Sequence, residues 1–317
     1  MNRILANDGI HASGLEMLIK AGFQVDTDHV PQDDLAAVLP IYDAIIVRSA
    51  TKVRQDLIDG CPDLKAIARG GVGMDNIDVA YAREKGIHVF NTPAASSRAV
   101  AELTMGHILA LSRFLHLANR EMPAKGISDF GAMKKAYSKG REIEGQTLGI
   151  VGFGRIGQSL AQLALGAGMK VIASDPFVEE AGLAWEINGY GPVEVRIRTR
   201  PLDEVLANAD FLSVHVPSLG GKPLLGAEEI RALKRGVILV NSARGGIIDE
   251  DALLSALESG QVGGAGLDVF VGEPTPRAEL LNHPRISVSP HIGASTNEAQ
   301  SRIGEELARG MIEFFRK

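Results

Sequence analysis

The sequence has little cysteine, few aromatic residues and no long apolar run. Its 317 residues include one cysteine, Cys61, so a disulfide within the chain is impossible and a reducing compartment is favoured. The N-terminal residues lack the apolar stretch behind a basic start that marks a secretory signal. No apolar run reaches the ~18 residues that a membrane-spanning helix needs. We therefore predict a cytoplasmic protein that does not enter a membrane.

An excess of positive charge is also missing. The formal net charge is −6, and acidic and basic residues are interleaved. A basic stripe for nucleic acid or a polybasic patch for anionic lipid is therefore not expected, and no metal site is predicted. The hydrophobic share of 45% and the charged share of 23% are ordinary for a globular protein. At roughly 150 residues per domain, the length predicts two domains.

Short apolar runs alternate with helical patterns along the chain. Strands are predicted at 3–6, 23–25, 44–47 and 65–68, with helices at 12–21 and from about Gln32. After Gly140 the alternation restarts, with six apolar runs at 146–151, 170–173, 211–215, 237–241, 264–269 and 285–288. This order predicts α/β lobes, each a parallel sheet with helices on both faces. Six runs are what one doubly wound nucleotide-binding domain requires.

A long helical pattern separates the two arrays. It runs from about residue 97 to 120 and is apolar almost all round, from Val100 to Leu117. A helix without a polar face is buried on several sides. It is therefore expected between two domains or between two subunits. The tail from residue 296 to 317 is again predicted to be helical.

A glycine-rich motif follows the first strand of the second array. The run 147–151 leads into Gly152, Gly154 and Gly157, and a helix is predicted over 158–165. In such a motif the first glycine allows a tight turn, the second admits a pyrophosphate and the third lets helix and strand pack closely. Asp175 ends the next strand, where a carboxylate accepts hydrogen bonds from ribose hydroxyls and repels a 2′-phosphate. A tight turn without a ligand is the alternative, but the context predicts NAD.

Three segments after the later strands carry candidate catalytic groups. Arg244 follows 237–241, and a guanidinium there can hold a carboxylate by two parallel hydrogen bonds. His291 follows the last strand and can donate a proton to a developing alkoxide or take it back. Glu273 can hydrogen-bond that imidazole and fix its tautomer. Taken singly, Arg244 and Glu273 would be surface residues and His291 a capped loop residue, but their order after successive strand ends favours a joint function.

The same stretches resemble the D-2-hydroxyacid dehydrogenases, and within that family most closely the D-3-phosphoglycerate dehydrogenases. The resemblance is carried by residues 47–53, 69–78, 91–93 and 101–104, by the glycine loop, by the Arg244 and Glu273 segments, and by 290–302. It covers nearly the whole chain. The segment 290–302 is specific for the phosphoglycerate branch, whereas the Arg, Glu and His motifs are shared across the family.

The resemblance implies a Rossmann NAD-binding lobe at 97–289, inserted into a flavodoxin-like substrate lobe made of 1–96 and 290–317. The implied catalytic residues are Arg244, which binds the substrate carboxylate and carbonyl, His291, the acid/base, and its partner Glu273. The implied cofactor-binding residues are Val72, Gly152, Gly154, Arg155, Ile156, Gly157, Asp175, His215, Val216, Pro217, Ser242, Ala243, Arg244, Asp268, His291, Gly293 and Ala294. The implied substrate-binding residues are Arg48, Ser49, Arg69, Gly71, Val72, Gly73, Asn76, Ser96 and Arg244.

The activity implied is the NAD-dependent interconversion of 3-phospho-D-glycerate and 3-phosphohydroxypyruvate, the first step of the phosphorylated route of serine biosynthesis. Family members dimerise through the nucleotide lobe, so a homodimer is expected. The alternatives are a hydroxypyruvate/glyoxylate or D-lactate reductase on the same fold, and an NADH-sensing corepressor-like binding protein. A phosphate-binding corner of Arg48, Lys52 and Arg69 would favour the phosphorylated substrate.

The sequence departs from the family pattern in three places. Ser96 stands where phosphoglycerate members often have asparagine, which puts one substrate contact in doubt. The segment from Val178 to Arg200 is longer than usual, and its alternating residues 193–199 indicate an extra strand pair. The turn after Pro217 also differs. The sequence stops after the last predicted helix, so feedback by serine through a C-terminal regulatory extension is not expected.

Overall fold

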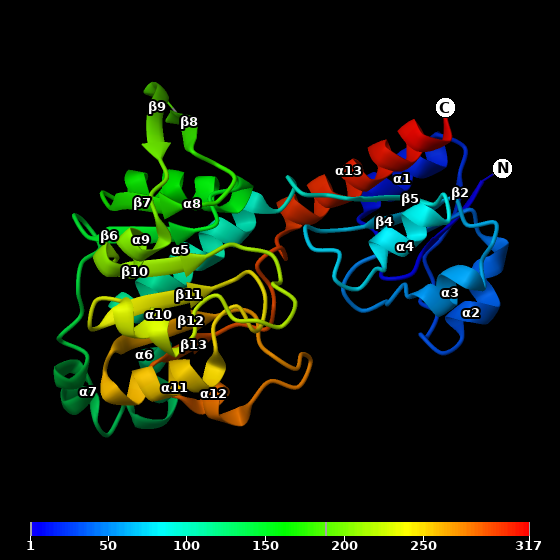
Figure 1. The fold of residues 1–317 in the computed structure, drawn as a ribbon. Helices are drawn as coiled ribbons and strands as arrows, with labels where there is room; N and C mark the ends of the chain where they lie inside the picture. The colour runs from blue at the N-terminus through cyan, green and yellow to red at the C-terminus, as the bar shows by residue number, and fades with distance from the viewer. Residues whose placement is uncertain (1, 188, 317) are drawn as a thin grey trace. The chain divides into compact units, whose positions relative to one another are not determined.

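The computed structural model describes residues 2–187 and 189–316, which form two units (Figure 1). Unit 1 comprises Met1–Ser97 and Ala294–Lys317, and unit 2 comprises Arg98–Gly293. The chain leaves unit 1 once and returns to it for its last helix. These boundaries fall at 97/98 and 293/294, beside the 96/97 and 289/290 expected from the sequence.

Unit 1 is built on a five-stranded parallel sheet in the order β2-β1-β3-β4-β5. Its strands are β1 (Arg3–Ala6), β2 (Gln24–Asp26), β3 (Ala44–Val47), β4 (Ala66–Arg69) and β5 (His88–Asn91). Its helices are α1 (Ala12–Lys20), α2 (Leu35–Val38), the 3₁₀ helix η1 (Leu39–Ile41), α3 (Gln55–Asp59), α4 (Val79–Glu84) and α13 (Asn297–Phe315). This strand order is that of flavodoxin-like folds, as predicted.

Successive residues of the unit 1 strands enter two different cores. Ile4 and Ile46 pack with residues of α1 and α13, whereas Leu5 and Ile45 pack with residues of α2, α3 and α4. Strands buried on both faces need apolar residues at every position, not at alternate ones. This explains why β3 is apolar throughout, and why β1 and β4 are apolar except for one arginine at an end.

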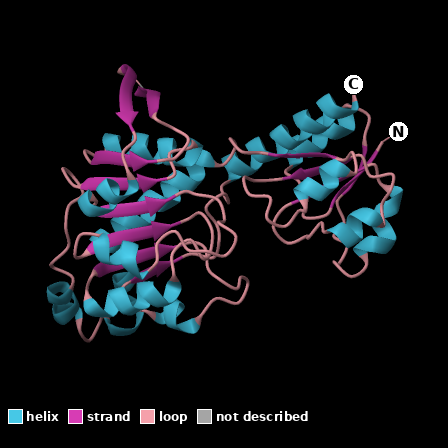
Figure 2. Cartoon of the chain, in the orientation of Figure 1, coloured by secondary structure: helices cyan, strands magenta, loops and turns pink. Residues whose placement is uncertain are grey.

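Unit 2 is built on a six-stranded parallel sheet in the order β13-β12-β11-β10-β6-β7. Its strands are β6 (Thr147–Val151), β7 (Lys170–Ser174), β10 (Phe211–Val214), β11 (Val237–Asn241), β12 (Val262–Leu267) and β13 (Ile286–Val288). Its helices are α5 (Ser97–Ser112), α6 (Leu115–Lys125), α7 (Phe130–Ala136), α8 (Arg155–Gly166), α9 (Leu202–Asn208), α10 (Ala227–Ala232), α11 (Glu250–Ser259) and α12 (Ala278–Asn282). All six predicted strands are present, and helices lie on both faces of this sheet (Figure 2).

The predicted extra strand pair is an antiparallel hairpin outside the main sheet. It is formed by β8 (Glu180–Ile187) and β9 (Gly191–Arg198), paired from Glu180–Arg198 onward. Leu183 and Ile197 are buried in the core that also contains β6 and α8. The alternating pattern of this segment was therefore a correct signal for strands.

The long helix expected over 97–120 is not continuous. It ends at Ser112 and a second helix begins at Leu115, because Phe114 adopts a left-handed conformation with φ of 55°. The ring of Phe114 stacks on Tyr137, and the carbonyl of Ser112 accepts a hydrogen bond from the amide of Arg141. Contacts from distant residues thus replace the next helical turn. The helix expected from about Gln32 is also shorter, beginning only at Leu35.

Candidate active site

The glycine loop joins β6 to α8 in unit 2. A Cβ at Gly152, which has φ of +92°, would collide with the carbonyl of His215, and one at Gly157 would collide with the carbonyl of Gly152. At Gly154, by contrast, no neighbouring atom lies within 4 Å of such a Cβ. The first and third glycines are therefore required by packing, whereas the second leaves open space beside the N-terminus of α8. An anion such as a pyrophosphate fits a bare backbone at a helix N-terminus.

Asp175 anchors this loop to the end of β7. Its Oδ2 accepts a hydrogen bond of 2.7 Å from the amide of Phe153, and its Oδ1 accepts from the amides of Phe177 and Val178 at 2.8 and 3.1 Å. A carboxylate offers about four acceptor sites, so these three contacts leave capacity for a ribose hydroxyl. Arg155 and Ile156 begin α8 beside it.

The residues His215, Val216 and Pro217 follow β10 next to the glycine loop. The imidazole Nε2 of His215 lies 2.9 Å from the hydroxyl of Ser213. Burial lowers the pKa of His215 to about 4, so this ring is neutral at physiological pH. It therefore adds no positive charge at the cofactor side of the sheet.

Arg244 lies in a tight loop after β11. The side chain of Asn241 closes this loop, since its amide nitrogen donates to the carbonyl of Arg244 at 2.8 Å and its oxygen accepts from the amide of Ala243 at 3.0 Å. A Cβ at Gly245 would collide with the carbonyl of Phe270. Glycine here allows the Arg244 loop to lie directly against the loop that follows β12.

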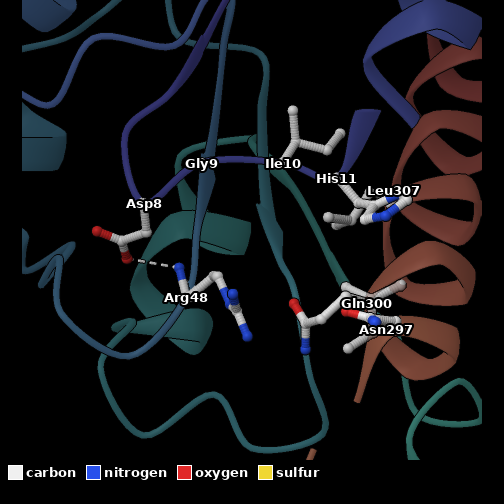
Figure 3. A pocket seen from close by; sticks show the side chains of 10 residues that line it. Asp8, Gly9, Ile10, His11, Arg48, Asn297, Gln300 and Leu307 are labelled. Carbon is white, nitrogen blue, oxygen red and sulfur yellow. Dashed lines mark hydrogen bonds between the residues drawn. The ribbon is translucent and has the colours of Figure 1, made fainter. Parts of the chain in front are cut away.

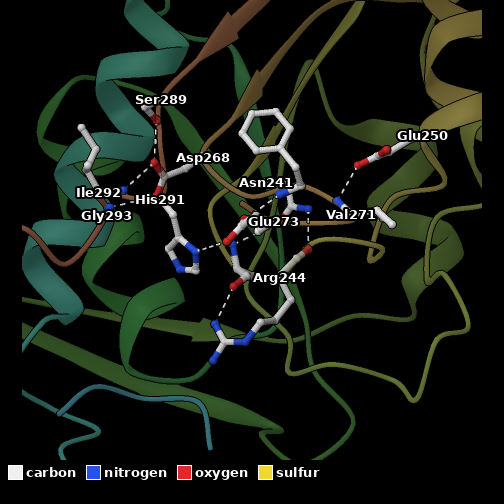
Figure 4. Close-up of polar contacts among 12 residues, drawn as sticks. Asn241, Arg244, Glu250, Asp268, Val271, Glu273, Ser289, His291, Ile292 and Gly293 are labelled. Carbon is white, nitrogen blue, oxygen red and sulfur yellow. Dashed lines mark hydrogen bonds and ion pairs between the residues drawn. The ribbon is translucent and has the colours of Figure 1, made fainter. Parts of the chain in front are cut away.

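Glu273 and His291 form a hydrogen-bonded pair between two loops. The Nδ1 of His291 lies 2.7 Å from Oε2 of Glu273, and Oε1 of Glu273 accepts a hydrogen bond from the amide of Phe270 at 2.9 Å. The two side chains are 43% and 33% exposed, so the pair is open to solvent. With Nδ1–H directed at the carboxylate, Nε2 is the ring nitrogen that can hold or accept the reacting proton. Figure 4 shows the imidazole of His291 directed at the carboxylate of Glu273.

Asp268 holds the His291 loop from behind. Its side chain is 1% exposed, and it accepts hydrogen bonds from the hydroxyl of Ser289 at 2.6 Å and from the amides of Ile292 and Gly293 at 2.9 and 2.8 Å. Its own carbonyl accepts from the amide of His291 at 2.8 Å. These contacts fix His291 in a left-handed conformation with φ of 55° (Figure 4).

Sequence reasoning missed one supporting residue in unit 2, Glu250. Its Oε1 accepts a hydrogen bond of 2.8 Å from the amide of Val271, two residues before Glu273. Burial raises the pKa of Glu250, against the effect of that hydrogen bond. The only available signal was its place at the start of the helix after the Arg244 segment.

The substrate residues expected in unit 1 lie on the loops after β3, β4 and β5, except for Arg69, which is the last residue of β4. Asp8 holds the Arg48 turn, accepting from the amides of Arg48 and Thr51 and from the Thr51 hydroxyl at 2.6, 3.1 and 2.6 Å. Asn76 supports the same turn, because its amide nitrogen donates to the carbonyls of Arg48 and Thr51. The side chain of Ser96 is buried. The remaining predicted positions are Ser49, Arg69, Gly71, Val72 and Gly73, with Ala294 at the start of the returning segment.

A pocket of about 320 Å³ opens in unit 1 where β1 and β3 end. Asp8 and Arg48 lie on one side of it and residues of α13 on the other (Figure 3). It is lined by Asp8, Gly9, Ile10, His11, Arg48, Asn297, Gln300, Ile303, Gly304 and Leu307. Asn297 and Gln300 were not among the predicted site residues, although Gln300 lies in the segment that carried the resemblance.

Residues 2–187 and 189–316 contain neither a metal-binding cluster nor a membrane-spanning helix. Among them, no group of three or more His, Cys, Asp or Glu side chains is arranged to hold a metal ion. No helix in the same part of the chain has the length and apolar character needed to cross a membrane.

Comparisons with known proteins give one consistent family. Residues 105–293 match the model of the "D-isomer specific 2-hydroxyacid dehydrogenase, NAD binding domain". A hydroxypyruvate reductase of Thermotoga maritima is 44% identical, over 98% of this chain and 97% of that protein. A D-3-phosphoglycerate dehydrogenase of Bacillus subtilis is 40% identical over 99% of this chain, which spans only 57% of that protein. The structure of a D-lactate dehydrogenase of Aquifex aeolicus, complexed with NAD and lactic acid, covers 99% of this chain and 96% of that one, with a TM-score of 0.76 and 29% identity.

Proposed function

The chain belongs to the D-isomer specific 2-hydroxyacid dehydrogenase family, a family of NAD-dependent oxidoreductases, and from this premise we propose that it interconverts 3-phospho-D-glycerate and 3-phosphohydroxypyruvate. This would be the first step of the phosphorylated route of serine biosynthesis. A cytoplasmic location, which the single cysteine favours, is part of the same proposal.

The chemistry is assigned to the three loops of unit 2. Bound NADH supplies the hydride. Arg244 binds the carboxylate of the keto acid and polarises its carbonyl, and His291 donates the proton that the new alkoxide needs. Glu273 accepts the Nδ1–H of His291 over 2.7 Å and thereby fixes the orientation of the ring. In the reverse direction, the neutral ring takes the proton back at Nε2.

The choice of a phosphorylated substrate is supported by the pocket of unit 1. Arg48 brings a permanent positive charge to this pocket, and a guanidinium binds phosphate with two parallel hydrogen bonds. The negatively charged carboxylate of Asp8, on the same side of the pocket, already accepts three hydrogen bonds from the Arg48 turn. His11, Asn297 and Gln300 add polar groups to the lining.

The second candidate is a hydroxypyruvate reductase. It is favoured by the Thermotoga maritima enzyme, which this chain matches over nearly the full length of both proteins. Hydroxypyruvate differs from 3-phosphohydroxypyruvate only in lacking the phosphate. The pocket around Arg48 is therefore the part of the molecule that should distinguish the two candidates.

The test measures NADH oxidation with 3-phosphohydroxypyruvate, hydroxypyruvate, glyoxylate, pyruvate and no keto acid. We expect the highest kcat/KM with 3-phosphohydroxypyruvate, and Arg48→Gln should lower that value by roughly 10- to 100-fold while changing the value for hydroxypyruvate little. A wild-type enzyme that prefers hydroxypyruvate, with Arg48→Gln affecting both substrates alike, would establish the second candidate. NADH binding without turnover of any keto acid would instead indicate the corepressor-like protein.

A homodimer through unit 2 completes the proposal. Large apolar side chains are exposed on α5, α6, α7 and the segment between α6 and α7, among them Leu109 at 44%, Leu115 at 57%, Ile127 at 105% and Phe130 at 58%. Large apolar side chains left exposed on successive helices support a protein–protein contact at these helices. Light scattering at micromolar concentration should give twice the mass of the chain. Leu115→Asp combined with Phe130→Asp should shift the protein toward the monomer.

A further inference from the structure

A buried histidine, His107, lies behind the loop that carries His291. It belongs to α5 and is 5% exposed. It sits against Gly266 of β12, where a Cβ would lie 2.7 Å from the Cβ of His107. Burial lowers the pKa of His107, an effect that His116 strengthens and Asp268 opposes, so the ring is neutral at physiological pH.

The hydrogen bonds of His107 fix the tautomer of its ring. Its Nδ1 lies 2.9 Å from the hydroxyl of Ser287 and its Nε2 lies 3.0 Å from the hydroxyl of Ser289. The hydroxyl of Ser289 donates its one proton to Asp268, since a carboxylate can only accept. Ser289 must therefore accept from Nε2–H of His107. The lone pair of the neutral ring is then at Nδ1, where it accepts from Ser287.

These contacts form a directed chain that ends at the active site. Each hydroxyl or N–H donates to the next group, from Ser287 through His107 and Ser289 to the carboxylate of Asp268. Asp268 in turn holds the amides of Ile292 and Gly293. This chain of hydrogen bonds thus runs from Ser287 through α5 to residues that precede and follow His291.

We propose that His107 is a positioning residue for His291, acting through Ser289 and Asp268. The proposal rests on the proposed function, in which His291 transfers the proton. Nε2–H of His107 keeps the Ser289 hydroxyl turned toward Asp268. Without it, Ser289 can rotate, Asp268 loses one of its three side-chain hydrogen bonds, and the His291 loop is held less firmly. A small displacement of an acid/base group is enough to slow turnover.

The first experiment compares three substitutions at position 107 by steady-state reduction of the best keto acid. His107→Leu removes both nitrogens and should lower kcat by roughly 10- to 100-fold with little change in KM. His107→Gln places an amide nitrogen near the position of Nε2 and should recover most of the rate. His107→Asn carries its amide one bond closer to the backbone, near the position of Nδ1, and should remain slow. A Gln variant as slow as the Leu variant, or three variants at the wild-type rate, would overturn the proposal.

A double variant tests the chain of hydrogen bonds from His107 through Ser289 to Asp268. Ser289→Ala should reproduce the loss of His107→Leu, and the two changes together should cost little more than either one, because both break the same chain. Additive losses would show that His107 acts by another route. Ser112→Ala is the matched control. This serine is also buried on α5, but its hydroxyl bonds to the carbonyl of Ile108, so its kcat should stay near that of the wild type.

A spectroscopic measurement does not depend on turnover. In wild-type protein labelled with ¹⁵N-histidine, His107, assigned by its absence in His107→Gln, should show the neutral Nε2–H tautomer at physiological pH. An Nδ1–H tautomer or a protonated ring would refute the direction of the chain. If no keto acid is reduced, the proposed function fails, whereas this spectrum still decides whether the chain of hydrogen bonds exists.

Discussion

Each unit holds a functional loop in place with one carboxylate that accepts three hydrogen bonds. In unit 1, Asp8 follows β1 and binds the turn of Arg48 and Thr51 after β3. In unit 2, Asp268 follows β12 and binds the segment from Ser289 to Gly293 after β13. The anchoring contact is the same, but the anchored loop carries a guanidinium in unit 1 and an imidazole in unit 2. Each sheet thus places a carboxylate at the end of a strand, whereas the loop sequence decides which side chain that carboxylate holds in place.

The largest effect on kcat should come from removing the imidazole of His291, the proposed acid/base in unit 2. His291→Ala should lower kcat by roughly 10²- to 10⁴-fold, the usual contribution of a positioned acid/base, with NADH affinity nearly unchanged. The control is His88→Ala in unit 1, whose ring stacks on Phe314, and its kcat should stay within about twofold of wild type. Stopped-flow reduction and fluorescence titration of NADH measure the two quantities. Equal losses of kcat in both variants would show that the His291 imidazole of unit 2 contributes no more to turnover than the His88 imidazole of unit 1.

The two anchors can be compared directly by the same substitution. Asp268→Asn and Asp8→Asn each place an amide NH₂ where backbone N–H groups need an acceptor, and each should lower the free energy of unfolding by about 1.5–3 kcal/mol. Asp268→Asn should also lower kcat for every keto acid. Asp8→Asn should raise KM for the phosphorylated substrate and leave kcat for hydroxypyruvate near its wild-type value. A kcat loss of the same size in both would show that the anchors do not serve different functions.

Asp175 is a third carboxylate that anchors a loop by three hydrogen bonds, and we expect it to act on the cofactor as well. Its charge should give the wild-type enzyme at least a tenfold preference for NAD over NADP, about 1.4 kcal/mol. Asp175→Ser should narrow this gap. Equal kcat/KM for NADH and NADPH in the unchanged protein would show that Asp175 anchors the loop without selecting the cofactor.

The smallest effect concerns Glu250, which holds the Glu273 loop by one hydrogen bond. Because burial raises the pKa of Glu250, its ionised form costs stability at neutral pH, and this cost disappears as the pH falls below the pKa of the unfolded chain. Glu250→Gln keeps the acceptor for Val271 and removes the charge. It should raise the free energy of unfolding by less than about 1 kcal/mol at pH 8, and by less still near pH 4. Urea unfolding at both pH values measures whether the free energy of unfolding rises or falls in the variant. A destabilised variant at pH 8 would contradict this account.

Much of the fold could be predicted because parallel sheets in α/β proteins have a local signature. A strand buried on both faces, such as β3, must be apolar throughout, and helices must separate such strands. The helix break at Phe114 could not be predicted in this way. It depends on the Tyr137 ring and on the Arg141 amide, and neither contact follows from the sequence near Phe114.

The same division holds for the site. Arg244, Glu273 and His291 were predicted as site residues because each follows a strand end, and the structure brings Glu273 and His291 within 2.7 Å. Glu250 and Gln300 were missed, since each lies at the start of a helix or on it and has no motif of its own. His107 gave no signal, because a histidine on an apolar helix is usually only a core residue.

By itself, the sequence determined which segments form the strands and most of the helices, where the glycine loop lies and which side chains follow each strand, because those properties depend on neighbours within a few residues. Only the tertiary structure decided which loops meet. Asp8 reaches Thr51 because β1 and β3 are adjacent in the sheet, and His107 reaches Ser289 across 182 positions because α5 packs against β12 and β13. Such contacts depend on strand order and on how closely a helix approaches a sheet, and both are set by the packing of the whole unit.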